Sequence, residues 1–255
     1  MNADHTLIAF YESIPNATVL GEINGVADQS QTFDASSRLQ APYNAVVLAA
    51  YAMGINATAF QIDAPSLRSF LLPNIYPVNP TADVRTLDGP VVYGDRGPRL
   101  LKAESVAPLV SRAGIDAQPC IVGLWLSDKR NPVPGGPITT VLASASPTIV
   151  AGSWVFGALT FAQSLPAGEY AVVGLAVQCN DATFARLVYP GAGGHRPGVV
   201  VQDAYGDLPT DDKFRYARFG HFGTFIHNAP PSIEILGDTA GAETAAVYLD
   251  VVKIR

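Results

Sequence analysis

Residues 32–50 read TFDASSRLQAPYNAVVLAA, and residues 160–176 read TFAQSLPAGEYAVVGLA. Each segment begins with Thr-Phe, passes through a Leu and a Pro, and reaches a Tyr that leads into an Ala-Val-Val run. The similarity continues in residues 56–60 (NATAF) and 181–185 (DATFA), with offsets of 127 at the tyrosines (170 − 43) and 125 at the threonines (183 − 58). A repeat this long exceeds a solenoid unit, so it predicts one β-domain built twice.

Shorter matches follow in the same order along the chain. The triplet TVL occurs at 18–20 and 140–142, and YGD occurs at 93–95 and 205–207. The pair AG occurs at 113–114 and 240–241, in each case before a strong apolar run (120–126 and 246–252). The two halves should meet in residues 127–137 (SDKRNPVPGGP), because three prolines and two glycines fit neither a helix nor a central strand. We therefore predict a first domain at 1–128, a Pro/Gly-rich linker at 129–137 and a second domain at 138–255.

Nearly every apolar segment is short, β-branched or aromatic, and bounded by Gly, Pro, Asn or Asp, which is typical of strands. The predicted strands are 6–11, 17–23, 31–33, 44–53, 57–62, 91–93, 120–126, 138–145, 148–150, 158–162, 169–178, 183–189, 199–201, 223–226, 233–235 and 245–254. Segment 169–178 is apolar on both faces over its middle, so we expect it to be covered on both sides. Helical turns are predicted only at 67–72 and 100–106, where Pro73 and Pro108 would stop them.

The strand count predicts an all-β chain of two similar jelly-roll sandwiches in tandem. About eight strands in each half of about 125 residues is typical of an eight-stranded jelly roll. A seven-stranded immunoglobulin-like sandwich stays open as an alternative for each half.

The composition bounds the classes of partner. Charged residues make up 15% of the 255 residues, against about a quarter in an average globular protein. Either part of the surface lies against other subunits, or Ser, Thr, Asn and Gln provide the contact with water. The net charge of −6 argues against a broad nucleic-acid surface. The first twenty residues contain no Lys or Arg, whereas a basic arm or a secretory signal would contain them. No apolar run is long enough to cross a bilayer.

No residue pattern predicts a cofactor or a metal ion. His221 and His227 would lie about 20 Å apart on a strand, too far to share a zinc ion. Cys120 and Cys179 sit in apolar runs and are predicted to be buried thiols rather than a disulfide. The loop with Asp203, Asp207, Asp211 and Asp212 is interpreted as solvated turn residues, with a calcium-binding loop as the alternative.

One stretch alternates basic and aromatic residues: KFRYARFGHFG at 213–223. Tyr, Phe and Arg are the residues that protein interfaces favour, so we interpret it as an interface strand. A purely structural strand and a stacking surface for single-stranded nucleic acid or sugar stay open as alternatives. The interface candidates are Phe214, Arg215, Tyr216, Arg218, Phe219 and Phe222.

The repeat of 17–62 in 140–187, the strand count and the composition together resemble the double jelly-roll coat proteins of viruses, the lineage of adenovirus- and tectivirus-like coats. The resemblance implies two jelly rolls standing side by side in the shell and three chains forming a pseudo-hexagonal capsomer. It also implies synthesis in the host cytoplasm and a place in the virion, with copies of the same chain as partners and minor capsid proteins as further partner candidates. The chain is short for this family and has no obvious membrane-anchoring arm beyond Met1–His5.

Three classes of function follow. The first is a bacteriophage-type major capsid protein, which is no enzyme, needs no cofactor or metal and binds no specific nucleic-acid sequence. The second is a β-sandwich module that binds carbohydrate or decorates a virion and attaches it. The third is an all-β hydrolase, for which Glu169 and Glu243 are the candidate carboxylate pair.

Overall fold

The computed structural model describes residues 5–12, 21–23, 33–34, 38–54, 57–67, 74–75, 91–112, 120–128, 132–190, 195–202 and 220–255. The chain divides into two compact units. The N-terminal unit extends from Ile8 to Asp128, and the C-terminal unit extends from Lys129 to Arg255 and includes Met1–Leu7. The division after Asp128 falls at the predicted end of the first domain, whereas the first seven residues belong to the second unit.

The N-terminal unit is built from two antiparallel sheets. One has the order β1-β11-β5-β8, with β9 also beside β5, and the other has the order β3-β4-β10-β6-β7, with β2 beside β10. Two 3-10 turns, η1 (Pro65–Leu67) and η2 (Gly94–Arg96), connect strands of this unit. The strands are β1 (Thr6–Glu12), β2 (Gly21–Glu22), β3 (Phe33–Asp34), β4 (Arg38–Gln40), β5 (Ala45–Met53), β6 (Ala57–Asp63), β7 (Asn74–Ile75), β8 (Val91–Val92), β9 (Arg99–Leu100), β10 (Ser105–Arg112) and β11 (Cys120–Ser127).

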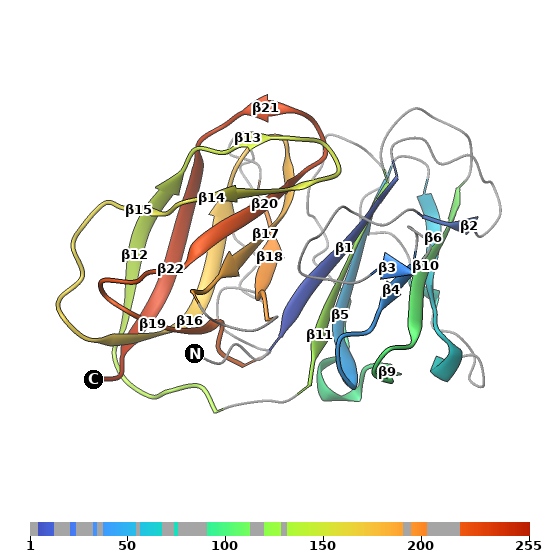
Figure 1. The fold of residues 1–255 in the computed structure, drawn as a ribbon, viewed down its shortest axis with the longest axis horizontal. Helices are drawn as coiled ribbons and strands as arrows, with labels where there is room; N and C mark the ends of the chain where they lie inside the picture. Colours follow the sequence, from blue (N-terminus) through green and yellow to red (C-terminus); the bar gives the residue numbers. More distant parts are fainter. Residues whose placement is uncertain are drawn as a thin grey trace. The chain divides into compact units, whose positions relative to one another are not determined.

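The C-terminal unit repeats this plan. Its sheets have the orders β15-β12-β22-β16-β19 and β14-β20-β17-β18, and β13 pairs with β21 (Figure 1). The strands are β12 (Ile138–Ala145), β13 (Thr148–Ile149), β14 (Trp154–Gly157), β15 (Thr160–Phe161), β16 (Glu169–Gln178), β17 (Ala182–Val188), β18 (Gly198–Val200), β19 (Gly223–Ile226), β20 (Ser232–Gly237), β21 (Gly241–Ala242) and β22 (Ala245–Lys253).

Each unit has a core between its two sheets. In the N-terminal unit, alternate residues of β5, β6, β10 and β11 meet there, including Ala50, Phe60, Val110 and Leu124. This alternation places one side of each strand against the facing sheet, as a sandwich requires. In β16, every residue from 170 to 177 is buried, which confirms the prediction that both of its faces are covered.

The central ladders of the two units are related by one offset. Ile121 pairs with Met53 in the N-terminal unit, and Ala246 pairs with Gln178 in the C-terminal unit, so both members shift by 125 residues (246 − 121 and 178 − 53). The offset holds along both ladders. Each ladder also leaves one strand residue unpaired, Leu48 in the first and Val173 in the second, again 125 residues apart (173 − 48).

The sheet that contains β6 and β10 and the sheet that contains β17 and β20 are related by the same offset. The ladder of β6 with β10 skips Thr58, and the ladder of β17 with β20 skips Thr183, 125 residues later (183 − 58). An extra residue of this kind is a β-bulge, a feature that is retained within families because it sets strand bend and twist. Two bulges at one common offset indicate that the sequence repeat extends over the whole domain.

The register corrects one of the matches found in the sequence. At the offset of 125 residues, Tyr43 corresponds to Gly168 and Ala45 corresponds to Tyr170. The alignment of the two tyrosines was therefore wrong by two residues. The error was hard to see because a shift of two residues keeps every side chain on the same face of a strand. The match of 18–20 with 140–142 stays a prediction, because residues 18–20 lie outside the described residues.

The helical turn predicted at 100–106 was also wrong. These residues form the end of β9, a turn and the start of β10, and Pro108 lies within β10 opposite Ile62. The turn is set by Ala103, whose φ of 64° is left-handed, and by Glu104, whose carboxylate accepts from the backbone N–H of Leu101. Of the turn predicted at 67–72, Leu67 ends η1 and the other residues lie outside the described ones. No helix among the described residues is long and apolar enough to span a membrane.

Candidate functional sites

The predicted interface strand is described only at its end. Phe214, Arg215, Tyr216, Arg218 and Phe219 lie outside the described residues. Phe222 is fully buried, so its side chain is part of the interior of the C-terminal unit and not of an exposed contact surface. The burial of Phe222 follows from its backbone position. Its N–H donates to the carbonyl oxygen of Val172 and so extends the sheet just before β19.

The carboxylates proposed for hydrolysis do not form a pair. Glu169 begins β16 and Glu243 precedes β22, and these strands run antiparallel, so the two residues lie at opposite ends of β22. Nine strand residues at ~3.3 Å each separate them by about 30 Å, whereas glycosidase carboxylates stand about 5–10 Å apart. The carboxylate of Glu169 instead faces Arg255 at 3.6 Å.

The other predicted polar sites are divided between the described and undescribed parts of the chain. The loop with Asp203, Asp207, Asp211 and Asp212 lies outside the described residues. Cys120 and Cys179 are both buried thiols, as predicted. Within the described ranges, no three His, Cys, Asp or Glu side chains are close enough together to hold a metal ion.

Three histidines that are distant in sequence, His5, His195 and His221, lie within electrostatic range of one another in the C-terminal unit. The imidazole of His5 is fully buried and meets the ring of Phe222 edge-on, with 5.0 Å between the ring centroids. Burial lowers the pKa of His5 from 6.5 to about 3, with smaller contributions from the charges of His195 and His221. Sequence reasoning missed this cluster because His5 and His195 are 190 residues apart (195 − 5) and no local motif connects them.

A buried arginine lies at the outer face of the sheet that contains β17. Arg186 is 1% exposed, and its guanidinium lies 4.0 Å from the centroid of the Trp154 ring. It binds Glu234 on the neighbouring strand at 2.7 Å, and Glu234 also accepts from Arg196 at 3.0 Å. A buried cation needs such partners, and the cross-strand register that places Arg186 opposite Glu234 provides the first of them.

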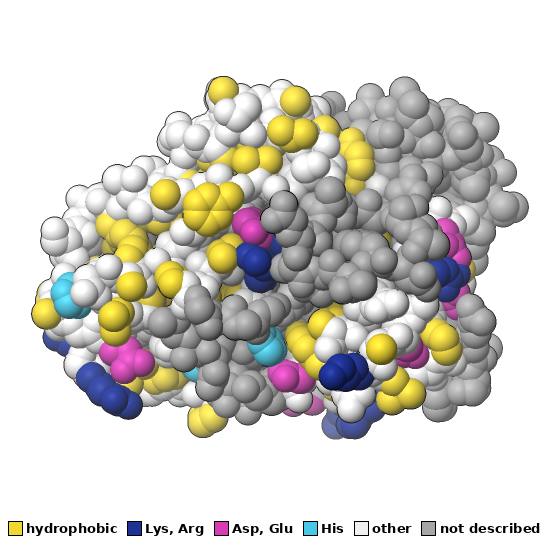
Figure 2. Space-filling view, viewed as in Figure 1, with side chains coloured by type: hydrophobic (Ala, Val, Ile, Leu, Met, Phe, Trp, Pro, Cys, Tyr) yellow, Lys and Arg dark blue, Asp and Glu magenta, His cyan; other side chains and the backbone are white. Residues whose placement is uncertain are grey.

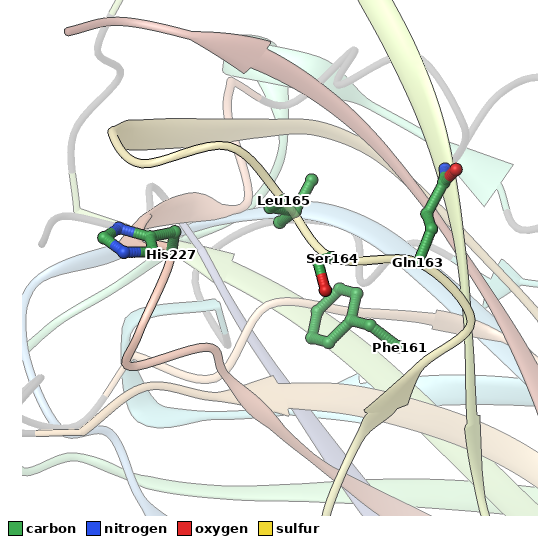
Figure 3. Close-up of a pocket in the computed structure, with 5 residues that line it drawn as sticks. All are labelled: Phe161, Gln163, Ser164, Leu165 and His227. Carbon is green, nitrogen blue, oxygen red and sulfur yellow. The ribbon is translucent and has the colours of Figure 1, made fainter.

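A small open hollow of about 270 Å³ lies beside β15 and β19 in the C-terminal unit (Figure 3). Its lining is Phe161, Gln163, Ser164, Leu165 and His227. Figure 3 shows that the amide of Gln163 and the imidazole of His227 point away from each other, so these polar groups do not converge on one reacting atom. The hollow is also at the small end for a ligand site.

Large apolar side chains are exposed on the C-terminal unit. Phe156 on β14 is 59% exposed, Ile138 on β12 is 53% exposed, and Leu142 and Ile226 are also exposed. Figure 2 shows hydrophobic side chains in yellow close together over the region where Figure 1 draws β13, β14 and β20. Apolar side chains gathered on a surface mark places where other molecules bind.

Comparison with known proteins does not extend this description. No protein-family model matches the sequence, and no curated protein is significantly similar to it.

Proposed function

We propose that the chain is a double jelly roll. Numbering the eight main strands of the C-terminal unit in chain order (β12, β14, β16, β17, β18, β19, β20, β22), its sheets have the orders 1-8-3-6 and 2-7-4-5. Numbering β1, β2, β5, β6, β7, β8, β10 and β11 in the same way gives the same two orders in the N-terminal unit. This is the strand order of a jelly roll, the eight-stranded sandwich of two Greek keys found in viral capsids and in lectins.

We propose further that the chain is a structural protein of a virus particle, most simply a phage-type major capsid protein. The observation that supports this best is the repetition of one eight-strand order and its two bulges within a single chain. Three copies of two fused jelly rolls give a ring of six similar sandwiches, which fits the pseudo-hexagonal capsomer of the family that the sequence resembles. The partners are then copies of the chain within a closed shell.

The surface supports assembly rather than catalysis. Phe156 and Ile138 are more than half exposed, and burying such apolar groups between subunits stabilises association by about 25 cal/mol per Å². The candidate carboxylates Glu169 and Glu243 are at opposite ends of a strand. Burial between subunits also explains the low content of charged residues in the chain, because the cores of interfaces are depleted in such residues.

A second candidate is a module that binds carbohydrate or decorates a virion. The hollow beside β15 favours it, because the ring of Phe161 offers an apolar face and the hydroxyl of Ser164 beside it offers a hydrogen-bonding group. Lectins also use the jelly roll. This candidate predicts binding of a free sugar by the isolated protein.

Light scattering coupled to size-exclusion chromatography separates the two candidates. A capsid protein gives trimers or larger assemblies whose mass rises with protein concentration, and it binds no sugar on a glycan array. A strict monomer at every concentration that binds one class of glycan would favour the carbohydrate-binding module and refute the capsid proposal.

A further inference from the structure

One exposed turn occurs in both units at the same position of the repeat. In the N-terminal unit it follows β9, and the N–H of Glu104 donates to the carbonyl oxygen of Leu101 at 3.2 Å. In the C-terminal unit it begins at the end of β19, and the N–H of Ala229 donates to the carbonyl oxygen of Ile226 at 2.8 Å. Donors and acceptors are both 125 residues apart (229 − 104 and 226 − 101), and the pairing of β9 with β5 and of β19 with β16 keeps this offset. These segments are named the Leu101 turn (101–104) and the Ile226 turn (226–229).

Each turn presents a large apolar side chain to solvent. Leu101 is 60% exposed and Ile226 is 44% exposed, whereas the residues before them, Leu100 and Phe225, are buried. The surrounding sequences differ, RLLKAE at 99–104 and TFIHNA at 224–229, but the exposed position is apolar in both. An exposed apolar side chain that both units keep at one position indicates that this surface contacts another molecule.

The Leu101 turn is held in one conformation. The carboxylate of Glu104 accepts from the N–H of Leu101 and from both the N–H and the hydroxyl of Ser66. The N–H groups of Lys102 and Ala103 donate to oxygen atoms of the segment just before β5. Ala103 has a left-handed φ of 64°, which a non-glycine residue keeps only where its surroundings impose it. A side chain presented on such a fixed turn loses little conformational freedom when it binds.

The two turns differ in charge. Arg99 and Lys102 in and before the Leu101 turn are both exposed, and neither has an ion-pair partner within the described residues. Glu169 lies opposite Ile226 in the pairing of β16 with β19, and its side chain is 32% exposed. Its ion pair with Arg255, at 3.6 Å, is open to solvent, and such pairs contribute little. The carboxylate of Glu169 is therefore available to a cation from another molecule.

The surface around the Ile226 turn offers further apolar area. Ile254 is 39% exposed, and its N–H donates to the carbonyl oxygen of Glu169. Ile138 is 53% exposed and lies opposite Val252. The strand register and the alternation of side chains place Ile138, Ile226 and Ile254 on one face of the sheet that contains β12, β22, β16 and β19.

We propose that the Leu101 turn of one chain binds the Ile226 turn of another copy of the chain. Leu101 packs against Ile226, while Arg99 and Lys102 face the carboxylate of Glu169. This contact deepens the proposed self-assembly, on which it rests. A contact between two different surfaces is head-to-tail, and such contacts close into rings, as a trimer requires. Two Leu101 turns repel each other through their cations, so charge favours the mixed pair.

Cysteine cross-linking of the full chain tests the contact. Leu101→Cys and Ile226→Cys place thiols on the two turns, whereas Cys120 and Cys179 are buried. When the two variants are mixed and oxidised with copper phenanthroline, we expect at least about 10-fold more disulfide-linked dimer than from either alone, because a disulfide needs Cα atoms within about 7 Å. Mass spectrometry should show the link between positions 101 and 226. Leu101→Cys mixed with Leu142→Cys, at another exposed leucine, is the control.

Charge reversal gives a second measurement that needs no added thiol. Arg99→Glu combined with Lys102→Glu should weaken assembly about 10-fold in sedimentation velocity, because like charges then face each other. Adding Glu169→Lys should restore assembly to within about 3-fold of the wild type. Adding Glu243→Lys instead, at the opposite end of β22, should restore nothing. Thermal unfolding of all these variants should match the wild type, since the changed side chains are on the surface.

The outcomes separate this contact from the assembly itself. A wild-type chain that assembles, while the mixed cysteine variants give no more dimer than the Leu142→Cys control, refutes the contact and leaves the proposed assembly standing. Equal yields from Leu101→Cys alone, or equal rescue by Glu243→Lys, also refute it. A wild-type chain that stays monomeric at every concentration refutes the proposed assembly, and the contact with it.

Discussion

Leu124 and Leu249 occupy equivalent positions in the two units, 125 residues apart (249 − 124), and both side chains are fully buried. We expect Leu124→Ala to destabilise the N-terminal unit and Leu249→Ala the C-terminal unit by similar amounts. Three buried carbon atoms at ~0.8 kcal/mol each account for about 2.4 kcal/mol, and the cavity raises the loss to about 3–4 kcal/mol. In a unit of this size the midpoint of thermal unfolding should fall by about 10–15 °C.

The assay is native-state hydrogen exchange followed by mass spectrometry of peptides from each unit. Leu124→Ala should accelerate exchange in β5 and β11 and leave β16 and β22 unchanged, and Leu249→Ala should do the reverse. Leu101→Ala, at a side chain that is 60% exposed, is the matched control and should change stability by less than about 0.5 kcal/mol. Equal acceleration in both units by either variant would refute the reasoning that each unit has its own core.

Three further substitutions test other features of the C-terminal unit. Gly223→Ala should cost about 2–3 kcal/mol in chemical denaturation, because φ is 123° and the new carbon would lie 2.6 Å from the Tyr189 ring, whereas Gly135→Ala, in open space, should cost almost nothing. Arg186→Met should cost about 3 kcal/mol in the same measurement, since it breaks a buried ion pair, and an unchanged midpoint would contradict that role. Phe156→Ser should lower the assembled fraction in sedimentation velocity without changing thermal stability, and unchanged assembly would remove this residue from the interface.

The sequence predicted the all-β class because strands leave a local signal in short β-branched runs bounded by turn residues. It missed β10 because Pro108 lies inside that strand, and a proline there is normally evidence against one. It missed the electrostatic interaction of His5 with His195 and His221 and the Arg186 network because their members are distant in sequence.

The repeat was faint in sequence for a packing reason. At equivalent positions in the two cores, Ala50 and Phe60 of the N-terminal unit correspond to Leu175 and Ala185 of the C-terminal unit. The small residue is on β5 in one unit and on β17 in the other, so the volume of the pair is nearly kept while both identities change. When the volume of a core is kept while its residues change, the strand pairing and the bulges are retained better than the residue identities. The pairing register therefore shows the offset fully, whereas the amino-acid sequence shows it only in part.

The central claim is that two equivalent jelly rolls in one chain assemble with copies of the same chain. Cryo-electron microscopy of the purified protein, concentrated at neutral pH, tests it most directly. The account predicts trimers of pseudo-hexagonal outline, alone or in closed shells, with two eight-stranded sandwiches in every chain. Particles that stay monomeric at every concentration, or density with one undivided sandwich in each chain, would contradict it.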